Sequence, residues 1–211
     1  ATAPPYVKDT PWAVSLFLQL CGDGVAEVRK EATKWSAKVL SVAVPDLFSK
    51  PATSGTGEAM AAAGTVSKSS RSTDAALVRH LMNTATPKKP FRSRMTYIQI
   101  CDSIIRAVAA QTPPPIFTDF LLRPLARLAV DPVRNVRLCW ALTMLPHVRS
   151  SGRLCQIKLL VVAAVRMAKE DKDPEILKIF ENVKFVEFAD TDADEALQSL
   201  QSTEGGTGNS S

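Results

Sequence analysis

Apolar residues recur along most of this chain at the three- and four-residue spacing of an amphipathic helix. The clearest stripe is Met95, Ile98, Cys101, Ile105 and Val108, with steps of three, three, four and three. No segment alternates cleanly between apolar and polar residues, as a half-buried strand would. Similar spacing predicts further helices over residues 12–20, 25–42, 74–82, 117–130, 133–148, 154–168 and 174–186. The fold class is therefore predicted to be all-α.

A seven-residue motif marks the start of two of these helices. Residues 23–29 read DGVAEVR and residues 131–137 read DPVRNVR, so both fit D-[GP]-V-x-x-V-R. A weaker copy begins at Asp173, 42 residues after Asp131, and a step of 42 residues back from Asp131 gives Lys89, at another helix start. The motif therefore predicts helical hairpins that repeat about every 42 residues.

One interval is longer than a repeat. Asp23 and Lys89 are 66 residues apart, 24 more than one period. Residues 49–72 account for the surplus, because they are rich in Ser, Ala, Gly and Thr and poor in large apolar side chains. The predicted organisation is a helical array over 11–188 with repeats at about 11–48, 73–110, 114–148 and 152–188, a disordered low-complexity insertion at 49–72, and a disordered acidic, Ser- and Gly-rich tail at 189–211.

The motif residues have structural roles that follow from helix chemistry. An Asp at the turn can accept hydrogen bonds from the free N–H groups of the following helix, and a Pro at the first helical position gives up an N–H that has no partner. The Arg six residues after the Asp can reach the turn of the neighbouring repeat and pair with its Asp. We therefore assign Asp23, Arg29 and Arg137 to a structural ladder.

Three blocks of sequence carry a family resemblance: residues 92–101 (RSRMTYIQIC), 121–137 (LLRPLARLAVDPVRNVR) and 172–180 (KDPEILKIF). They resemble HEAT repeats, and in particular the C-terminal repeats of phosphatase subunits of the protein phosphatase 2A scaffold (A) and protein phosphatase 4 regulatory subunit 1 type. The resemblance covers residues 90–188 and implies an α-α superhelix, a HEAT-repeat solenoid of about four hairpins. It also implies a non-catalytic scaffold whose turn ridge binds a serine/threonine phosphatase catalytic subunit, with room for further regulatory subunits.

The charge distribution bears on the kind of partner that this ridge would bind. The net charge is +5, but residues 1–184 carry 26 basic and 15 acidic side chains, a net charge of +11. Such a body favours an acidic partner. Nucleic acid is an alternative partner, although basic and aromatic residues are not interleaved as in stacking platforms, and a HEAT module of another large assembly is a third reading. The candidate partner-binding residues are Arg92, Arg94, Asp131, Arg134, Asn135, Lys172 and Asp173.

No catalytic constellation is visible in the sequence. His80 and His147 are the two histidines and lie in different repeats, and no Ser, Cys or carboxylate stands beside either at motif spacing. The pair Gly55 and Gly57 is not followed by the G-K-[ST] of a phosphate-binding loop. The chain is therefore predicted to be no enzyme and to need no cofactor or metal.

The cysteines, the tryptophans and the longest apolar run complete the picture. The run at 159–165 is too short to cross a bilayer, which needs about 20 residues. The cysteines lack the C-x-x-C spacing of a zinc or redox site, so we expect free thiols in a reducing compartment, in the cytoplasm or also the nucleus. Core packing is predicted for Cys21, Cys101, Cys139, Cys155, Trp12, Trp35 and Trp140.

Overall fold

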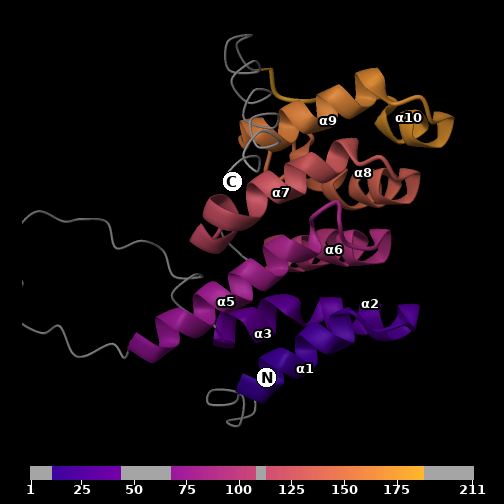
Figure 1. Ribbon diagram of the computed structural model, residues 1–211. Coiled ribbons are helices and arrows are strands. Elements are labelled where there is room, and N and C mark those ends of the chain that lie inside the picture. The colour runs from indigo at the N-terminus through magenta and orange to yellow at the C-terminus, as the bar shows by residue number, and fades with distance from the viewer. Residues whose placement is uncertain (1–10, 44–67, 108–112, 188–211) are drawn as a thin grey trace, which may run out of the picture.

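The computed structural model describes residues 11–43, 68–107 and 113–187, and in these ranges the chain is all-helical, with no strand. Figure 1 shows the helices lying one above another in chain order. Their bounds are α1 (Pro11–Cys21), α2 (Ala26–Lys34), α3 (Ser36–Ala43), α5 (Lys68–Thr84), α6 (Phe91–Ala107), the π-helix η2 (Phe117–Leu121), α7 (Leu122–Arg127), the 3₁₀-helix η3 (Leu128–Val130), α8 (Arg134–Val148), α9 (Lys158–Glu170) and α10 (Pro174–Phe180).

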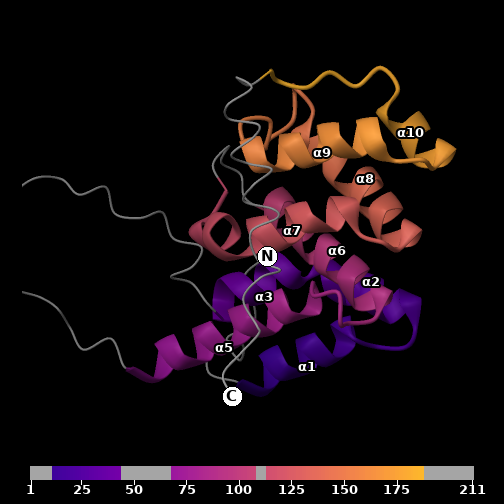
Figure 2. The ribbon, with the colours of Figure 1, turned by 45° about the horizontal axis from the view of Figure 1, so that its top comes forward.

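Neighbouring helices pair and then stack. Helix α1 packs on α2 and α3, α5 on α6, η3 on α8, and α9 on α10. The second members of the pairs also contact one another, α2 and α3 with α6, α6 with α8, and α8 with α10. The turned view in Figure 2 keeps the same order from α1 to α10. The turns within the pairs therefore lie along one edge, on the right of Figure 1.

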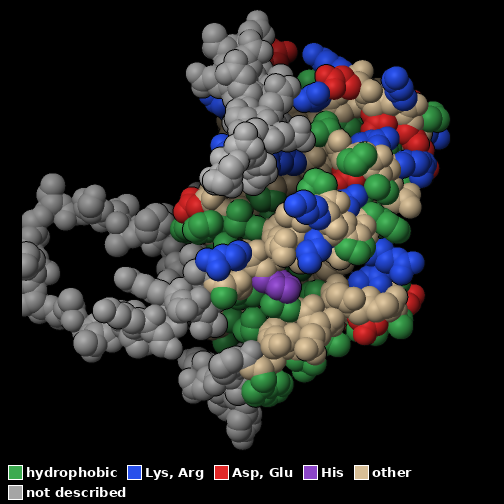
Figure 3. Space-filling view, in the orientation of Figure 1, with side chains coloured by type: hydrophobic (Ala, Val, Ile, Leu, Met, Phe, Trp, Pro, Cys, Tyr) green, Lys and Arg blue, Asp and Glu red, His purple; other side chains and the backbone are tan. Residues whose placement is uncertain are grey.

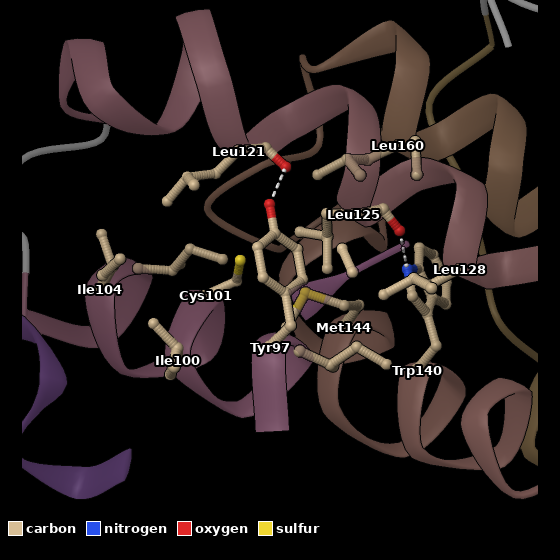
Figure 4. Packing of buried hydrophobic residues seen from close by; sticks show 14 of the residues in the cluster. Tyr97, Ile100, Cys101, Ile104, Leu121, Leu125, Leu128, Trp140, Met144 and Leu160 are labelled. Carbon is tan, nitrogen blue, oxygen red and sulfur yellow. Dashed lines mark hydrogen bonds between the residues drawn. The ribbon is translucent and has the colours of Figure 1, made fainter. Parts of the chain in front are cut away.

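The core lies between the first helices of the pairs and the second helices of the pairs. Tyr97 of α6 and Trp140 of α8 are fully buried, and they point toward Leu121 at the end of η2 and Leu125 of α7 (Figure 4). The Tyr97 hydroxyl donates to the carbonyl oxygen of Leu121 at 2.9 Å, and the indole N–H of Trp140 donates to that of Leu125 at 2.8 Å. Burying these rings contributes apolar surface, and the two hydrogen bonds satisfy their polar atoms inside the core.

The segment that contains these two carbonyls is not the single regular helix predicted over 117–130. It runs as a π-helix, a short α-helix and a 3₁₀-helix. Pro124 lies within it and has no N–H to donate to the preceding turn, which breaks the regular hydrogen-bond series. The side chains of Tyr97 and Trp140 supply donors to carbonyls in this irregular stretch.

Other helix boundaries also differ from the sequence prediction. The helix predicted over 25–42 is broken at Trp35 into α2 and α3. Helix α9 begins at Lys158, four residues after the predicted start, and Leu154 is buried in the preceding loop. Helix α10 ends at Phe180, before the predicted end at 186, and Asn182 follows with a φ of 63°, a left-handed conformation that stops a helix.

The predicted insertion and tail lie mostly outside the described residues. Helix α5 begins at Lys68, before the predicted start at 74, so residues 68–72 of the predicted insertion are helical. The rest of that insertion, 49–67, and the predicted tail, 189–211, are not described. Over the residues that are, no helix combines the length and hydropathy needed to cross a membrane.

The predicted core positions are partly wrong. Trp140 is buried, but Trp12 is 62% and Trp35 is 55% exposed. Helix α1 carries apolar residues around most of its circumference, so its sequence does not tell which side is covered. The cysteines are free thiols, with Cys21 and Cys101 buried and Cys139 and Cys155 half-buried.

Candidate partner-binding ridge

The Asp of each motif copy binds a backbone N–H of its turn, but only Asp173 caps its helix as predicted. Asp23 accepts a hydrogen bond from the N–H of Val25 at 2.7 Å, and Asp131 accepts one from Val133 at 2.8 Å. Asp173 accepts from both Glu175 and Ile176, at 3.0 and 3.2 Å. Asp173 thus caps α10 by satisfying N–H groups that the first turn of a helix leaves without a partner, whereas Asp23 and Asp131 bind the N–H of the N-cap residue and so close the turn that precedes the helix. The turns therefore have a fixed local shape.

Arginine side chains fold back onto the same turns. Arg29 donates to the carbonyl oxygens of Asp23 and Gly24 at 2.6 and 3.0 Å. Arg137 makes the corresponding bonds to Asp131 and Pro132 at 3.0 and 3.4 Å. Two motif copies far apart in sequence thus use their Arg in the same way, as a clamp on the turn from which their helix begins.

Two arginines also link one turn to the next. Arg94 binds both carboxylate oxygens of Asp131, at 2.7 and 2.9 Å, while its Nη1 donates to the carbonyl oxygen of Lys89 at 2.5 Å. Arg137 binds both oxygens of Asp171, at 2.7 and 3.2 Å. Such paired N–H···O contacts fix orientation as well as distance. We call Arg94–Asp131 and Arg137–Asp171 the ladder, because they hold three successive turns in register.

The ladder differs from the prediction in its members. Arg94 and Asp131 were expected to face a partner, but their side chains are only 5% and 3% exposed and their charges are directed at each other. Arg137 takes the expected role, although it pairs with Asp171 and not with the motif residue Asp173. Arg29 clamps only its own turn within the described residues, since the next turn carries Lys89 where the others carry Asp.

The remaining predicted contacts lie on the surface beside the ladder. Arg92, Arg134, Asn135 and Lys172 are exposed and Asp173 is half-buried. The guanidinium of Arg134 pairs with Asp173 and Glu175 across the last two turns, and 44% of its side chain stays exposed. Figure 3 shows basic side chains gathered near the edge where the turns lie. These residues form what we call the turn ridge: the ladder, with Arg92, Arg134, Asn135 and Lys172 on its outer side.

One polar contact, between Asp102 and His147, was not predicted from the sequence. Asp102 of α6 lies 2.7 Å from Nε2 of His147 on α8 and also accepts from Arg106. Burial raises the pKa of the Asp102 carboxyl, but the hydrogen bonds from His147 and Arg106 outweigh it, so the pKa lies below its usual range. Since 45 residues separate Asp102 from His147, no local sequence spacing could predict the pair.

Burial raises the pKa of the Cys139 thiol to about 11, so this thiol stays protonated at neutral pH.

The ladder makes stability depend on pH. Burial raises the pKa of the Asp171 carboxyl, but the hydrogen bonds from Arg137 and from the N–H of Asp173 together lower it by more than burial raises it. The pKa therefore lies below its ordinary value. A carboxylate with a depressed pKa stabilises the fold fully above its unfolded pKa of about 3.9, and that stability is lost as the pH falls through the folded pKa.

We therefore expect the urea concentration at the midpoint of unfolding to decrease when the pH is lowered below about 4. The decrease should be smaller in Asp171→Asn, because this variant has already lost the Arg137–Asp171 pair. Midpoints measured at neutral and acidic pH check this. Glu181→Gln, at an exposed carboxylate outside the ladder, is the control, and its urea midpoint should decrease at acidic pH as much as that of the wild type. An equal acid-induced loss in Asp171→Asn would contradict the assignment.

Neither a metal cluster nor a known relative adds to this picture. In the part of the chain that the structure describes, no group of three or more His, Cys, Asp or Glu side chains is placed to hold a metal ion. Comparisons of the chain with protein-family models, with curated proteins and with solved structures find no match.

Proposed function

We propose that this chain is a non-catalytic scaffold or regulatory subunit, folded as a HEAT-type solenoid, whose turn ridge binds the catalytic subunit of a serine/threonine protein phosphatase. The observation that carries the proposal is the ladder, which joins successive turns into one edge with fixed spacing. A binding surface of fixed shape loses little conformational entropy when a partner docks. The choice of a phosphatase rests on the resemblance of residues 92–101, 121–137 and 172–180.

The chemistry of the ridge favours an acidic protein surface as the partner. Arg92 and Lys172 are exposed on its outer side, and Arg134 keeps much of its side chain exposed. Arginine is common in interface hot spots because its planar guanidinium binds carboxylates in two places and stacks on aromatic rings. The ladder arginines take no part in this contact, since their charges are already paired inside the molecule.

Nucleic acid remains the second candidate because of the basic body. However, Arg94, Arg106, Arg134, Arg137 and Arg166 each bind a carboxylate within the described residues. Their charges are therefore partly neutralised before any phosphate could bind. A mobility-shift titration at about 50 mM salt separates the two candidates, since phosphate contacts are strongest at low salt. A shift there with no phosphatase recovered would favour nucleic acid.

The deciding experiment is affinity purification of the tagged chain at low salt, followed by mass spectrometry. We expect a serine/threonine phosphatase catalytic subunit at near-stoichiometric yield. Arg92→Glu should lower that yield several-fold, because it reverses an exposed charge on the turn ridge. Arg123→Glu is the matched control, since Arg123 is exposed on α7, eight residues before the turn at Asp131. Absence of the catalytic subunit would refute the phosphatase, and equal yields from the two variants would refute the ridge.

A further inference from the structure

An apolar groove lies between α1 and α5, the first helices of the first two pairs. It encloses about 590 Å³, and the beginning of α6 forms its floor. Further along the stack α7 contacts α9, and α5 contacts η2, but α1 and α5 are not among the closely packed pairs of described helices. The lining includes the small residues Ser15, Gly22, Ala76 and Ser93, which leave the space between the helices unfilled.

The walls of the groove are hydrophobic and long enough to receive a helix. Val14 and Leu18, which are half-buried on α1, and Leu77 and Leu81, which are buried on α5, line it, and Figure 3 shows hydrophobic side chains on this part of the surface. The lining runs from Val14 to Cys21 on α1, which at 1.5 Å per residue corresponds to about 12 Å, or two turns of a helix. Polar side chains also line the groove, among them Ser93 and Thr96 from α6.

The lining of the groove carries basic but no acidic side chains. Helix α1 has no charged residue, and no carboxylate is among the described residues that line the groove. Lys89 belongs to the lining, and the exposed residues Arg79, Lys88 and Arg92 adjoin lining residues in sequence. Asp23 adjoins Gly22, but it is half-buried and accepts the N–H of Val25. An apolar cleft with a basic rim complements an apolar stripe flanked by carboxylates.

We propose that this groove binds an amphipathic α-helix of a partner protein, with apolar residues facing α1 and α5 and acidic residues facing Lys89 and its neighbours. No residue that lines the groove belongs to the turn ridge, although Arg92 of the ridge lies beside the lining residue Ser93, so the proposal does not depend on a phosphatase as the ridge partner. A scaffold with both surfaces holds two proteins at once. The resemblance implies further regulatory subunits, and the groove gives such a subunit a place to dock.

The test uses three labelled synthetic helices of about 18 residues and measures their binding to the full chain by fluorescence anisotropy. The first has leucines at i, i+3, i+4 and i+7 with glutamates elsewhere. The second replaces the glutamates with lysines, and the third replaces the leucines with serines. We expect the first to bind, with an affinity that falls as salt rises, and the other two to bind at least about tenfold more weakly.

Two variants locate the binding site without disturbing the core. Ser15→Glu introduces a negative charge at an exposed lining position, and Lys89→Glu reverses the charge of the rim. Each should weaken the acidic helix at least about tenfold. Ser41→Glu makes the same change as the first at an exposed position of α3 outside the groove, and it should leave binding unchanged. Circular dichroism confirms that each variant is folded, and phosphatase recovery by Ser15→Glu should equal that of the wild type.

Several results would overturn the proposal. It fails if the acidic helix does not bind, if the lysine or serine helix binds as well, or if Ser15→Glu retains full affinity. Sedimentation equilibrium showing a dimer that Ser15→Glu converts to a monomer would make the occupant a second copy. The chain's own acidic segment would be the occupant if the full-length triple variant Asp192→Asn, Asp194→Asn, Glu195→Gln bound the acidic helix about tenfold more tightly than the wild type.

Discussion

Asp131→Asn is expected to lower the free energy of unfolding by about 3–5 kcal/mol, the cost of removing one partner from a buried ion pair. The side chains of Arg94 and Asp131 are 5% and 3% exposed, and both carboxylate oxygens bind the guanidinium. Asparagine keeps the volume and one acceptor oxygen, but it turns an N–H₂ group toward a donor of Arg94. The positive charge is then left in the interior without an anion.

The control is the same substitution at the equivalent place in another turn. Asp173 also begins a D-P turn and accepts from two N–H groups of its helix, which asparagine can still do as a helix cap. Its ion-pair partner Arg134 has 44% of its side chain exposed, so water compensates the loss. Asp173→Asn should therefore leave the urea midpoint nearly unchanged. A comparable change in both variants would mean that the buried Arg94–Asp131 pair contributes no more to stability than the exposed Arg134–Asp173 pair.

The features that the sequence predicted well are those set by local chemistry. The three motif aspartates each bind a backbone N–H two residues on, because such a contact depends only on local sequence, although only Asp173 caps its helix as expected. Val136 and Trp140 are fully buried, as their three- and four-residue spacing within a helix indicates. The break at Pro124 also has a local signal, which the apolar periodicity of 117–130 obscured.

The features that were missed depend on which helices become neighbours. Arg94 lies one residue before the position that a 42-residue step assigns to the equivalent of Arg137, so the repeat register pointed to Met95. Its pairing with Asp131 appears only when the two turns are brought together. Likewise, Trp12 is exposed because nothing among the described residues covers that side of α1. The groove has the same origin, since it exists where α1 and α5 fail to close on each other.

The connection between α8 and α9 contains the most sterically restricted glycine of the described residues. A Cβ at Gly152 would lie 2.1 Å from the carbonyl oxygen of His147, 2.4 Å from its carbonyl carbon and 2.8 Å from the carbonyl oxygen of Pro146. All three are backbone atoms, so no side-chain rotation relieves the contact. The same carbonyl of His147 accepts the N–H of Leu154 at 2.7 Å, and Leu154 is buried.

Gly152→Ala is therefore expected to lower the free energy of unfolding by about 3 kcal/mol, because the loop must move away from the end of α8 to admit the methyl group. That movement also weakens the hydrogen bond from the N–H of Leu154 to the carbonyl oxygen of His147 and the packing of α9 on α8. Gly24→Ala is the matched control, since a Cβ there meets nothing within 4 Å, and its effect should stay within about 0.5 kcal/mol.

Urea unfolding followed by far-ultraviolet circular dichroism compares the two alanine variants under identical conditions. Both exchange one glycine in a turn for alanine, so they alter the entropy of the unfolded chain equally, and the difference between them isolates the steric contact at His147. Equal stabilities would show that the loop 149–157 yields at little cost. In that case the last two helices would be held to the stack by their apolar faces and by the ion pairs of Arg137 with Asp171 and of Arg134 with Asp173 and Glu175.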